Sequence, residues 1–401
     1  MARRLILPVL LIAVLLTSTL ALYTLVTSRY RFLVWDFHQL WSGTRAILLH
    51  GENPYSEAVT ERIEVELHGH PLPPNESVVG FFYPLYTAYL IAPVALLPYA
   101  LAEAAWFSLL ELAIVIGIVA GVAALGWKPQ PALLVGLVIG SGMLYPVTWS
   151  FILGQISLFV LALLALTLWA VRRRRDGWAG ILLALTTVKP QMAFLIVPAL
   201  LIWAVARRRW RIVGGFSVTL GLLLLSSLVW LLTWIGDFVA VSSRYYQTVP
   251  FPPPVQLLTE WCGSRFHALA AWLLAALLLT IVGWSWWRAI RNAEETIHIA
   301  CGLTLAATTL VAPRTSQVNQ VLLVLPLLFL LYHLWQRGAG GRIIGLAFFL
   351  LMLIGPWAVR AASRIPQGLE GYAIEHRLIS PILPVATWLA LLVWLALRRE
   401  S

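Results

Sequence analysis

Six polar residues in a largely apolar sequence have side chains that could do chemistry on an anionic, hydroxyl-bearing substrate. A carboxylate can take a proton from a hydroxyl group. Cationic side chains form strong, charge-assisted hydrogen bonds to phosphate, and amides hydrogen-bond to other polar groups. The six are one carboxylate, two cations and three amides: Asp36, Lys189, Arg314, Gln155, Gln317 and Asn319.

Several of these residues also have a purely structural interpretation, which the sequence leaves open. Asp36 could cap the helix that follows it, since aspartate is favoured at a helix start. Lys189 and Arg314 could be interface anchors whose charged groups extend to water, and Gln155 could cap a helix. His38, two residues after Asp36, is a further candidate for a substrate contact.

The elements that would have to position these residues are membrane-spanning helices. The 401 residues are 60% hydrophobic and 11% charged, a composition typical of a polytopic membrane protein. Several stretches of about 17 or more residues contain hardly a charge, which is enough to cross the hydrocarbon core as a helix. We expect an all-α fold with about eleven transmembrane helices, in one integral domain covering residues 1–401.

The net charge of +11 comes largely from arginine clusters between the apolar runs, at 172–175, 207–211, 288–291, 337–342 and 398–399. This placement is typical of cytoplasmic anchors, so it gives no indication of a nucleic-acid partner. With Arg3 and Arg4 inside, residues 5–26 are expected to form an uncleaved first helix, which leaves the N-terminus in the cytoplasm.

The order of the apolar segments then sets the topology. Four segments precede the arginines at 172–175, namely 81–98, 101–125, 132–149 and 156–171, and four crossings would place that cluster outside. Residues 81–98 are short and carry three prolines, so we expect them to be re-entrant. Residues 177–206 lie between two clusters and are expected to form a hairpin with Lys189 at its outer tip. The later crossings are 212–234, 266–287, 296–312, 317–335, 342–359 and 381–397.

On this topology the long loops, 29–80, 236–265 and 360–380, face outside, and the first should carry helices that lie on the membrane surface. Binding and catalytic residues concentrate on loops held by a rigid scaffold. All six polar residues reach this outer boundary. No metal or cofactor site is expected, because the two cysteines match no ligand spacing and the prolines after His68-Gly69-His70 indicate a flexible loop.

Six short motifs occur in an order that resembles a known family. Together they are similar to glycosyltransferase family 87 of the GT-C superfamily, from the N-terminus to about residue 330. Two features depart from the family pattern. Ser157 stands where members often have Asn, and Gln317, Asn319 and Gln320 stand where mannosyltransferase members carry histidines. The motifs are Trp35-Asp36-Phe37, Asn53-Pro54-Tyr55, Tyr83-Pro84-Leu85, Gly154-Gln155-Ile156-Ser157, Lys189-Pro190-Gln191 and Pro313 before a polar helix start.

The resemblance implies a GT-C fold with Asp36 as catalytic base in the first extracytoplasmic loop. It also implies metal-independent, inverting transfer of a sugar, often mannose, from a polyprenyl-phosphate donor. We expect a glycan or glycolipid acceptor, and a plasma membrane with the active site outside. Lys189 and Arg314 would bind the donor phosphate, and the substrate contacts would be His38, Gln155, Gln317 and Asn319. The alternative is a transporter or flippase of a lipid-linked or small solute, but the sequence shows no internal repeat typical of that class.

Overall fold

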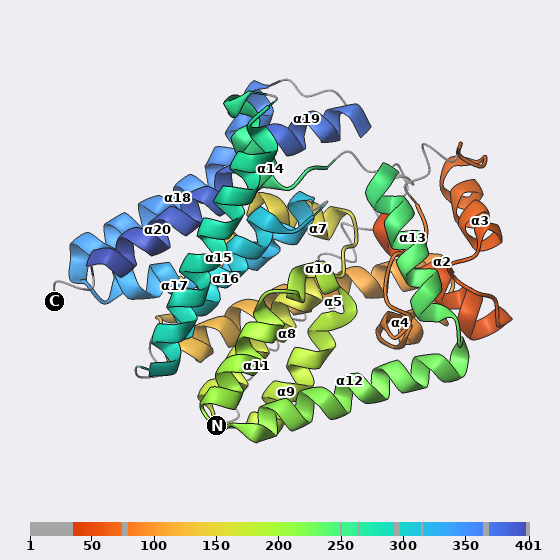
Figure 1. The fold of residues 1–401 in the computed structure, drawn as a ribbon, viewed down its shortest axis with the longest axis horizontal. Helices are drawn as coiled ribbons and strands as arrows, with labels where there is room; N and C mark the ends of the chain where they lie inside the picture. The colour runs from red at the N-terminus through yellow and green to blue at the C-terminus, as the bar shows by residue number, and fades with distance from the viewer. Residues whose placement is uncertain are drawn as a thin grey trace. The chain divides into compact units, whose positions relative to one another are not determined.

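The computed structural model describes residues 35–73, 79–248, 251–263, 265–291, 297–313, 316–363 and 369–397. Within these ranges the chain forms helices joined by turns and no β-strand (Figure 1). The prediction of an all-α protein is thereby confirmed. The predicted first helix, residues 5–26, lies outside the described ranges. The chain divides into two compact units, and the prediction of one domain over 1–401 stays a prediction.

The first unit contains residues up to 115, together with 150–159 and 220–249. The helices that lie wholly within it are α2 (Trp35–His50), α3 (Glu57–His68), α4 (Thr87–Ala95) and α13 (Trp234–Thr248). The sequence defines both ends of α3: the Ser56 side chain accepts a hydrogen bond from the N–H of Val59, and Gly69 ends the helix with φ 80°. These are the usual capping arrangements of a helix start and a helix end.

Helix α4, within residues 81–98, is too short to cross a membrane, and the re-entrant arrangement of this segment stays a prediction. Nine residues rise only about 14 Å, roughly half of the hydrocarbon thickness. Helix α2 packs against α4. Arg45 Nη1 donates to the carbonyl oxygen of Ala95 at 2.8 Å, and Trp41 Nε1 donates to that of Leu97 at 3.3 Å. Carbonyls at a helix end have no partner within the helix, so α2 satisfies the C-terminus of α4.

The second unit contains residues 116–149, 160–219 and 250 onward. Helices α5 (Tyr99–Leu125), α7 (Tyr145–Ile152), α8 (Ser157–Arg172) and α12 (Trp210–Trp230) have residues in each unit. The remaining elements belong to the second unit: α6 (Pro131–Gly142), α9 (Asp176–Leu185), η1 (Thr186–Val188), α10 (Pro190–Ala193), α11 (Ile196–Ala206), α14 (Pro254–Thr259), η2 (Glu260–Cys262), α15 (His267–Arg291), α16 (Ile297–Val311), η4 (Gln317–Leu323), α17 (Val324–Trp335), α18 (Gly338–Ala362), α19 (Leu369–Ile379) and α20 (Ile382–Leu397).

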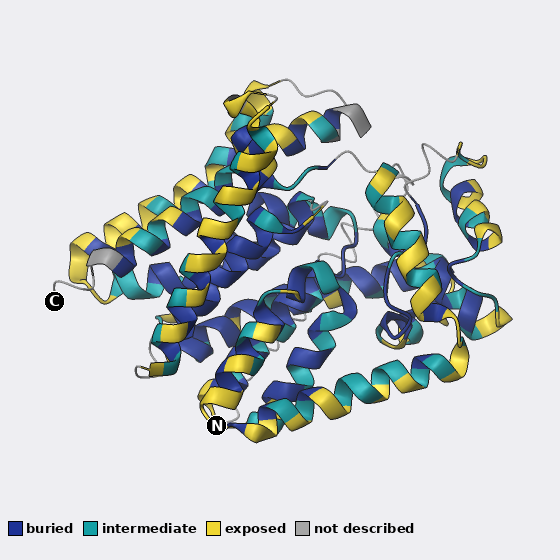
Figure 2. Cartoon of the chain, viewed as in Figure 1, coloured by how far each residue is buried: buried dark blue, intermediate teal, exposed yellow. Residues whose placement is uncertain are grey.

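Helix α16 forms the centre of the second unit. Each of its residues from Ile297 to Leu310 is buried (Figure 2), and it packs against α15, α17 and α20. The hydroxyls of Thr304 and Thr308 donate to carbonyl oxygens one turn earlier in the same helix. These polar groups are therefore satisfied internally, as an apolar environment requires.

Helices α12, α15 and α18 instead expose large apolar side chains along their length (Figure 2). Leu222 and Val229 of α12, Trp272 of α15 and Ile343 of α18 are each more than half exposed. Contiguous exposed apolar surface of this kind is rare on soluble proteins. It fits helices that face lipid.

Six helical segments are long and apolar enough to cross a bilayer, or seven if the pair α6 and α7, bent by 64°, counts as one span. The protein is therefore a multi-pass membrane protein. The predicted number of about eleven stays a prediction, because α8, α11 and α16 are shorter apolar helices and residues 5–26 are not described. The spans are Tyr99–Leu125, Trp210–Trp230, His267–Arg291, Gln317–Trp335, Gly338–Ala362 and Ala373–Leu395. The last of these begins inside the predicted outer loop 360–380.

The predicted hairpin between two arginine clusters consists of α9, η1, α10 and α11, and Lys189 lies at the break between η1 and α10. Its base is closed by Arg209, whose Nε donates to Oδ2 of Asp176 at 3.1 Å. Helices α9 and α12 also approach closely at Gly180, where a Cβ atom would lie 2.2 Å from the carbonyl oxygen of Ile212. The hairpin therefore depends on a small residue at this crossing.

Candidate active site

Two of the predicted site residues touch within the first unit. Nε2 of Gln155 donates a hydrogen bond to Oδ2 of Asp36 at 2.5 Å. Asp36 lies in the first turn of α2 and is partly exposed, whereas Gln155 is buried. Ser157 Oγ donates to Oε1 of Gln155 at 3.4 Å, which orients the amide nitrogen toward the carboxylate. A hydrogen bond from an amide N–H to a carboxylate favours the ionised form of that carboxylate, which is the form that a general base requires.

The position of Gln155 is set by the turn that precedes α8. Gly154 has φ 70°, a left-handed conformation that glycine adopts without strain. Trp106 of α5 is fully buried, and its Nε1 donates to the carbonyl oxygen of Gly154 at 2.8 Å. Its ring stacks on Phe37 of α2 and Phe159 of α8, with centroids 5.1 and 4.9 Å apart. Trp106 therefore holds the turn against the helix that carries Asp36.

Tyr83 is a site residue whose role the sequence did not indicate, although it lies in a motif of the resemblance. It is buried, and its pKa is raised well above the usual value, first by burial and then by the negative charge of Asp36. The phenol is therefore neutral and lies within electrostatic reach of the carboxylate. A neutral phenol can donate a hydrogen bond, which makes Tyr83 a further candidate residue for the site.

The motif Asn53-Pro54-Tyr55 holds the Tyr83 segment in place. The Tyr55 hydroxyl donates to the carbonyl oxygen of Tyr83 at 2.7 Å. Asn53 Oδ1 accepts from the N–H of Tyr55, and Asn53 Nδ2 donates to Oδ2 of Asp237 in α13, each at 2.9 Å. These residues position others and do not contact Asp36 through any of these bonds.

His38 is packed among other side chains of the first unit. It is 8% exposed, its Nε2 lies 3.4 Å from Oε2 of Glu66, and its ring centroid is 5.0 Å from that of Tyr99. Burial lowers its pKa to about 4. The Glu66 carboxylate acts in the opposite direction, but the contact is long and burial dominates. His38 is therefore neutral at pH 7, and its predicted substrate contact stays a prediction.

The remaining predicted residues that the structure describes lie in the second unit. Lys189 is only 3% exposed, which does not fit an anchor that extends its charge to water. Gln317 and Asn319 lie in η4 and are buried. Both polar atoms of the Gln317 side chain lack a hydrogen-bond partner among the described residues, and such buried groups usually find one. Arg314 lies outside the described residues.

The structure thus brings Asp36 and Gln155 into contact, and Tyr83 lies within electrostatic range of the carboxylate. Lys189, Gln317 and Asn319 belong to the second unit. The gathering of all these residues into one site stays a prediction.

An apolar cavity of about 440 Å³ lies beside Pro313, the residue before Arg314. It is enclosed by α14, the first turns of α15 and the end of α16, and most of its lining is apolar. The residues that line it include Val255, Ala271, Trp272 and Val311. No pattern in the sequence indicated it, because its walls come from three separate segments.

Comparison with protein families gives one match relevant to this site. The model described as glycosyltransferase family 87 matches residues 81–313, more than half of the 401-residue chain. The matched range includes Tyr83, Gln155 and Lys189 and begins after the segment that carries Asp36. Comparison with curated proteins and with solved structures gave no match.

Proposed function

Since the chain belongs to glycosyltransferase family 87, we propose that it transfers a sugar from a polyprenyl-phosphate donor to an envelope glycan or glycolipid. Membership of the family makes the protein a glycosyltransferase. The donor class, mannose as the sugar, the inverting course and the outer face of the plasma membrane are parts of the proposal.

The contact between Gln155 and Asp36 is the observation that carries the proposed mechanism. Asp36 accepts the proton of the acceptor hydroxyl, while the hydroxyl oxygen attacks the anomeric carbon of the donor sugar. The bond from that carbon to the phosphate oxygen breaks, and polyprenyl phosphate leaves with the electron pair. Attack opposite the leaving group inverts the anomeric centre. Gln155 holds the carboxylate, and Tyr83 offers a hydrogen bond to a substrate oxygen.

The second unit supplies the groups that suit the donor. Lys189 and Arg314 are the proposed partners of the donor phosphate, because cations bind phosphate through charge-assisted hydrogen bonds. The unsatisfied amide of Gln317 suits a sugar hydroxyl. The apolar cavity beside Pro313 suits the first isoprene units of the prenyl chain.

The test is a transfer assay on purified protein in nanodiscs with radiolabelled polyprenyl-phosphate mannose and, separately, polyprenyl-phosphate pentose. A cell-envelope extract serves as the acceptor. We expect Asp36→Asn to lower kcat by about 10²–10⁴-fold, the usual contribution of a general base. Glu61→Gln is the matched control, because Glu61 is an exposed carboxylate of the same predicted loop and should keep full activity.

Full activity of Asp36→Asn would contradict the assignment of the base. Transfer from the pentose donor alone would replace mannose in the proposal. Labelled donor that crosses the bilayer unchanged, with no transfer product, would favour the transporter alternative.

A further inference from the structure

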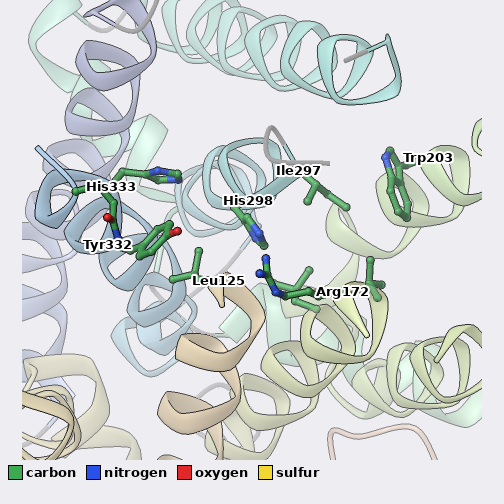
Figure 3. Close-up of a pocket in the computed structure, with 10 residues that line it drawn as sticks. Leu125, Arg172, Trp203, Ile297, His298, Tyr332 and His333 are labelled. Atoms are coloured by element: carbon green, nitrogen blue, oxygen red, sulfur yellow. The ribbon is translucent and has the colours of Figure 1, made fainter. Parts of the chain in front are cut away.

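A second cavity, of about 520 Å³, lies among helix ends of the second unit (Figure 3). It is lined by the ends of α5, α8 and α17, the last turns of α11 and the start of α16. The charge pattern assigns all five of these ends to the cytoplasmic side, and arginines 172–175 and 207–209 follow two of them directly. The cavity beside Pro313 lies at the opposite end of α16, about 22 Å away along the helix. The two cavities are therefore separate sites.

Among the described residues, the lining offers hydrogen-bond donors and no carboxylate. Its ten residues include Arg172, His298, Tyr332, His333 and Gln336 and contain no Asp or Glu. Figure 3 shows the His298 ring and the Arg172 guanidinium pointing toward one another. A guanidinium beside an imidazole, with no acid among the described lining residues, favours an anion next to the guanidinium.

Two buried nitrogen atoms in this cavity have no partner among the described residues. His298 is 8% exposed with an unsatisfied Nδ1, and Trp203 is 1% exposed with an unsatisfied Nε1–H. Buried polar groups are usually hydrogen-bonded, and each exception calls for an explanation. The polar atoms of a ligand in the cavity would supply the missing partners.

The backbone also leaves room for the cation. Gly126, which follows α5, has φ 67°, and a Cβ atom there would lie 2.1 Å from Nη2 of Arg172. The turn therefore holds the guanidinium over a residue without a side chain. Leu125, Leu168 and Val171 form an apolar wall next to it, so the cavity combines a phosphate-type polar site with apolar surface at a helix end.

We propose that this cavity binds the phosphate headgroup of an anionic membrane lipid, with Arg172 and His298 as the headgroup contacts. Basic pockets between transmembrane helices on the cytoplasmic side are suited to such headgroups. The apolar wall accommodates the start of the acyl chains. This site does not depend on the proposed glycosyl transfer, because it shares no residue with it.

The experiment uses full-length protein, delipidated in detergent, with photoreactive phosphatidylglycerol or photoreactive phosphatidylcholine as the probe. Labelled peptides are located by mass spectrometry. We expect phosphatidylglycerol to label the ends of α8, α16 and α17 in the wild-type protein, and phosphatidylcholine to label them at least about five-fold less. Arg172→Ala should weaken that labelling on the order of ten-fold, the effect of losing a charge-assisted hydrogen bond.

Arg173→Ala is the matched control, since it removes the same charge from the adjacent exposed position without altering the lining. Equal loss in the two variants, or equal labelling by both lipids, would overturn the proposal. If phosphatidylglycerol did not label these helix ends but inorganic phosphate bound the wild type and not Arg172→Ala, the site would belong to free phosphate instead of a lipid. If Arg172→Ala does not fold, the peptides labelled in the wild-type protein still test the proposal. Labelling spread over the whole wild-type protein would also overturn it.

Discussion

At the scale of single residues, Gln155 is the partner through which the catalytic role of Asp36 can be tested. Gln155→Ala removes a hydrogen bond to a charged group, and such bonds contribute about 1.5–3 kcal/mol. We therefore expect kcat to fall roughly ten-fold or more, while KM for the donor changes little. Steady-state kinetics measure this. Gln130→Ala is the control, because the exposed Gln130 side chain makes no capping bond. An unchanged kcat in Gln155→Ala would remove the amide from the mechanism.

A second prediction at this scale concerns His38, whose pKa burial lowers to about 4 from an ordinary value near 6.5. Between these two values the unfolded chain binds a proton that the folded protein does not. Stability is therefore full above about pH 6.5 and declines as the pH falls toward 4, by up to about 3 kcal/mol, less the opposing effect of Glu66.

Thermal unfolding in detergent at pH 7.5, 6 and 5 measures this decline. His38→Gln should show a flatter dependence on pH than the wild type, whereas substitution of the exposed His70 by Gln should not alter it. Parallel curves for wild type and His38→Gln would show that His38 does not titrate as its burial indicates.

The sequence singled out Asp36 and Gln155 as candidate site residues but not the contacts that hold them together. An aspartate at the end of an apolar run can be recognised from the sequence alone. The role of Trp106 cannot, because a tryptophan in an apolar helix has no distinguishing pattern and its hydrogen-bond partner Gly154 lies 48 positions away. Asp237 is hidden for the same reason, since its partner Asn53 lies 184 positions away. Such contacts depend on how distant segments pack together, and the local hydrophobic periodicity of the sequence carries no information about that packing.

At the scale of elements, the crossing of α9 and α12 decides whether the hairpin that carries Lys189 can form. At Gly180 an added Cβ would collide with backbone, 2.2 Å from the carbonyl oxygen of Ile212, whereas a Cβ at Gly177 meets nothing within 4 Å. We expect Gly180→Ala to destabilise the protein by about 1–3 kcal/mol, as overpacking does. Gly177→Ala, on the same helix, should be neutral or slightly stabilising.

Chemical or thermal unfolding of the two variants in the same detergent makes the comparison. If Gly177→Ala proved as destabilising as Gly180→Ala, the loss would come from the helix itself and not from its crossing with α12.

Elements were predictable where charge or proline marks their ends. The hairpin at 177–206 is predictable because arginines flank it, and residues 81–98, which contain the nine-residue α4, are predicted to be re-entrant because they are short and carry three prolines. The bend between α6 and α7 was not expected, since residues 132–149 read as one apolar run. Hydrophobicity alone does not distinguish a straight helix from a broken one.

At the scale of the whole molecule, Cys262 tests the orientation in the membrane. The structure describes two free cysteines, of which Cys262 is exposed and Cys301 buried. Cys262 lies in the predicted outer loop 236–265. A membrane-impermeant maleimide should therefore label intact cells that express the protein, and Cys262→Ser should abolish the labelling. Labelling that appears only after permeabilisation would place this loop, and the proposed active site, in the cytoplasm.

Helix α16 also has a consequence for how the protein is made. It packs against α20, which the ribosome delivers only after α17, α18 and α19. Until then α16 lacks one of its packing partners, so the face of the helix that contacts α20 stays uncovered in the nascent chain. The packing around α16 can be completed only once residues 382–397 have been synthesised. Chains that stall before that point are therefore the ones that membrane proteases should degrade.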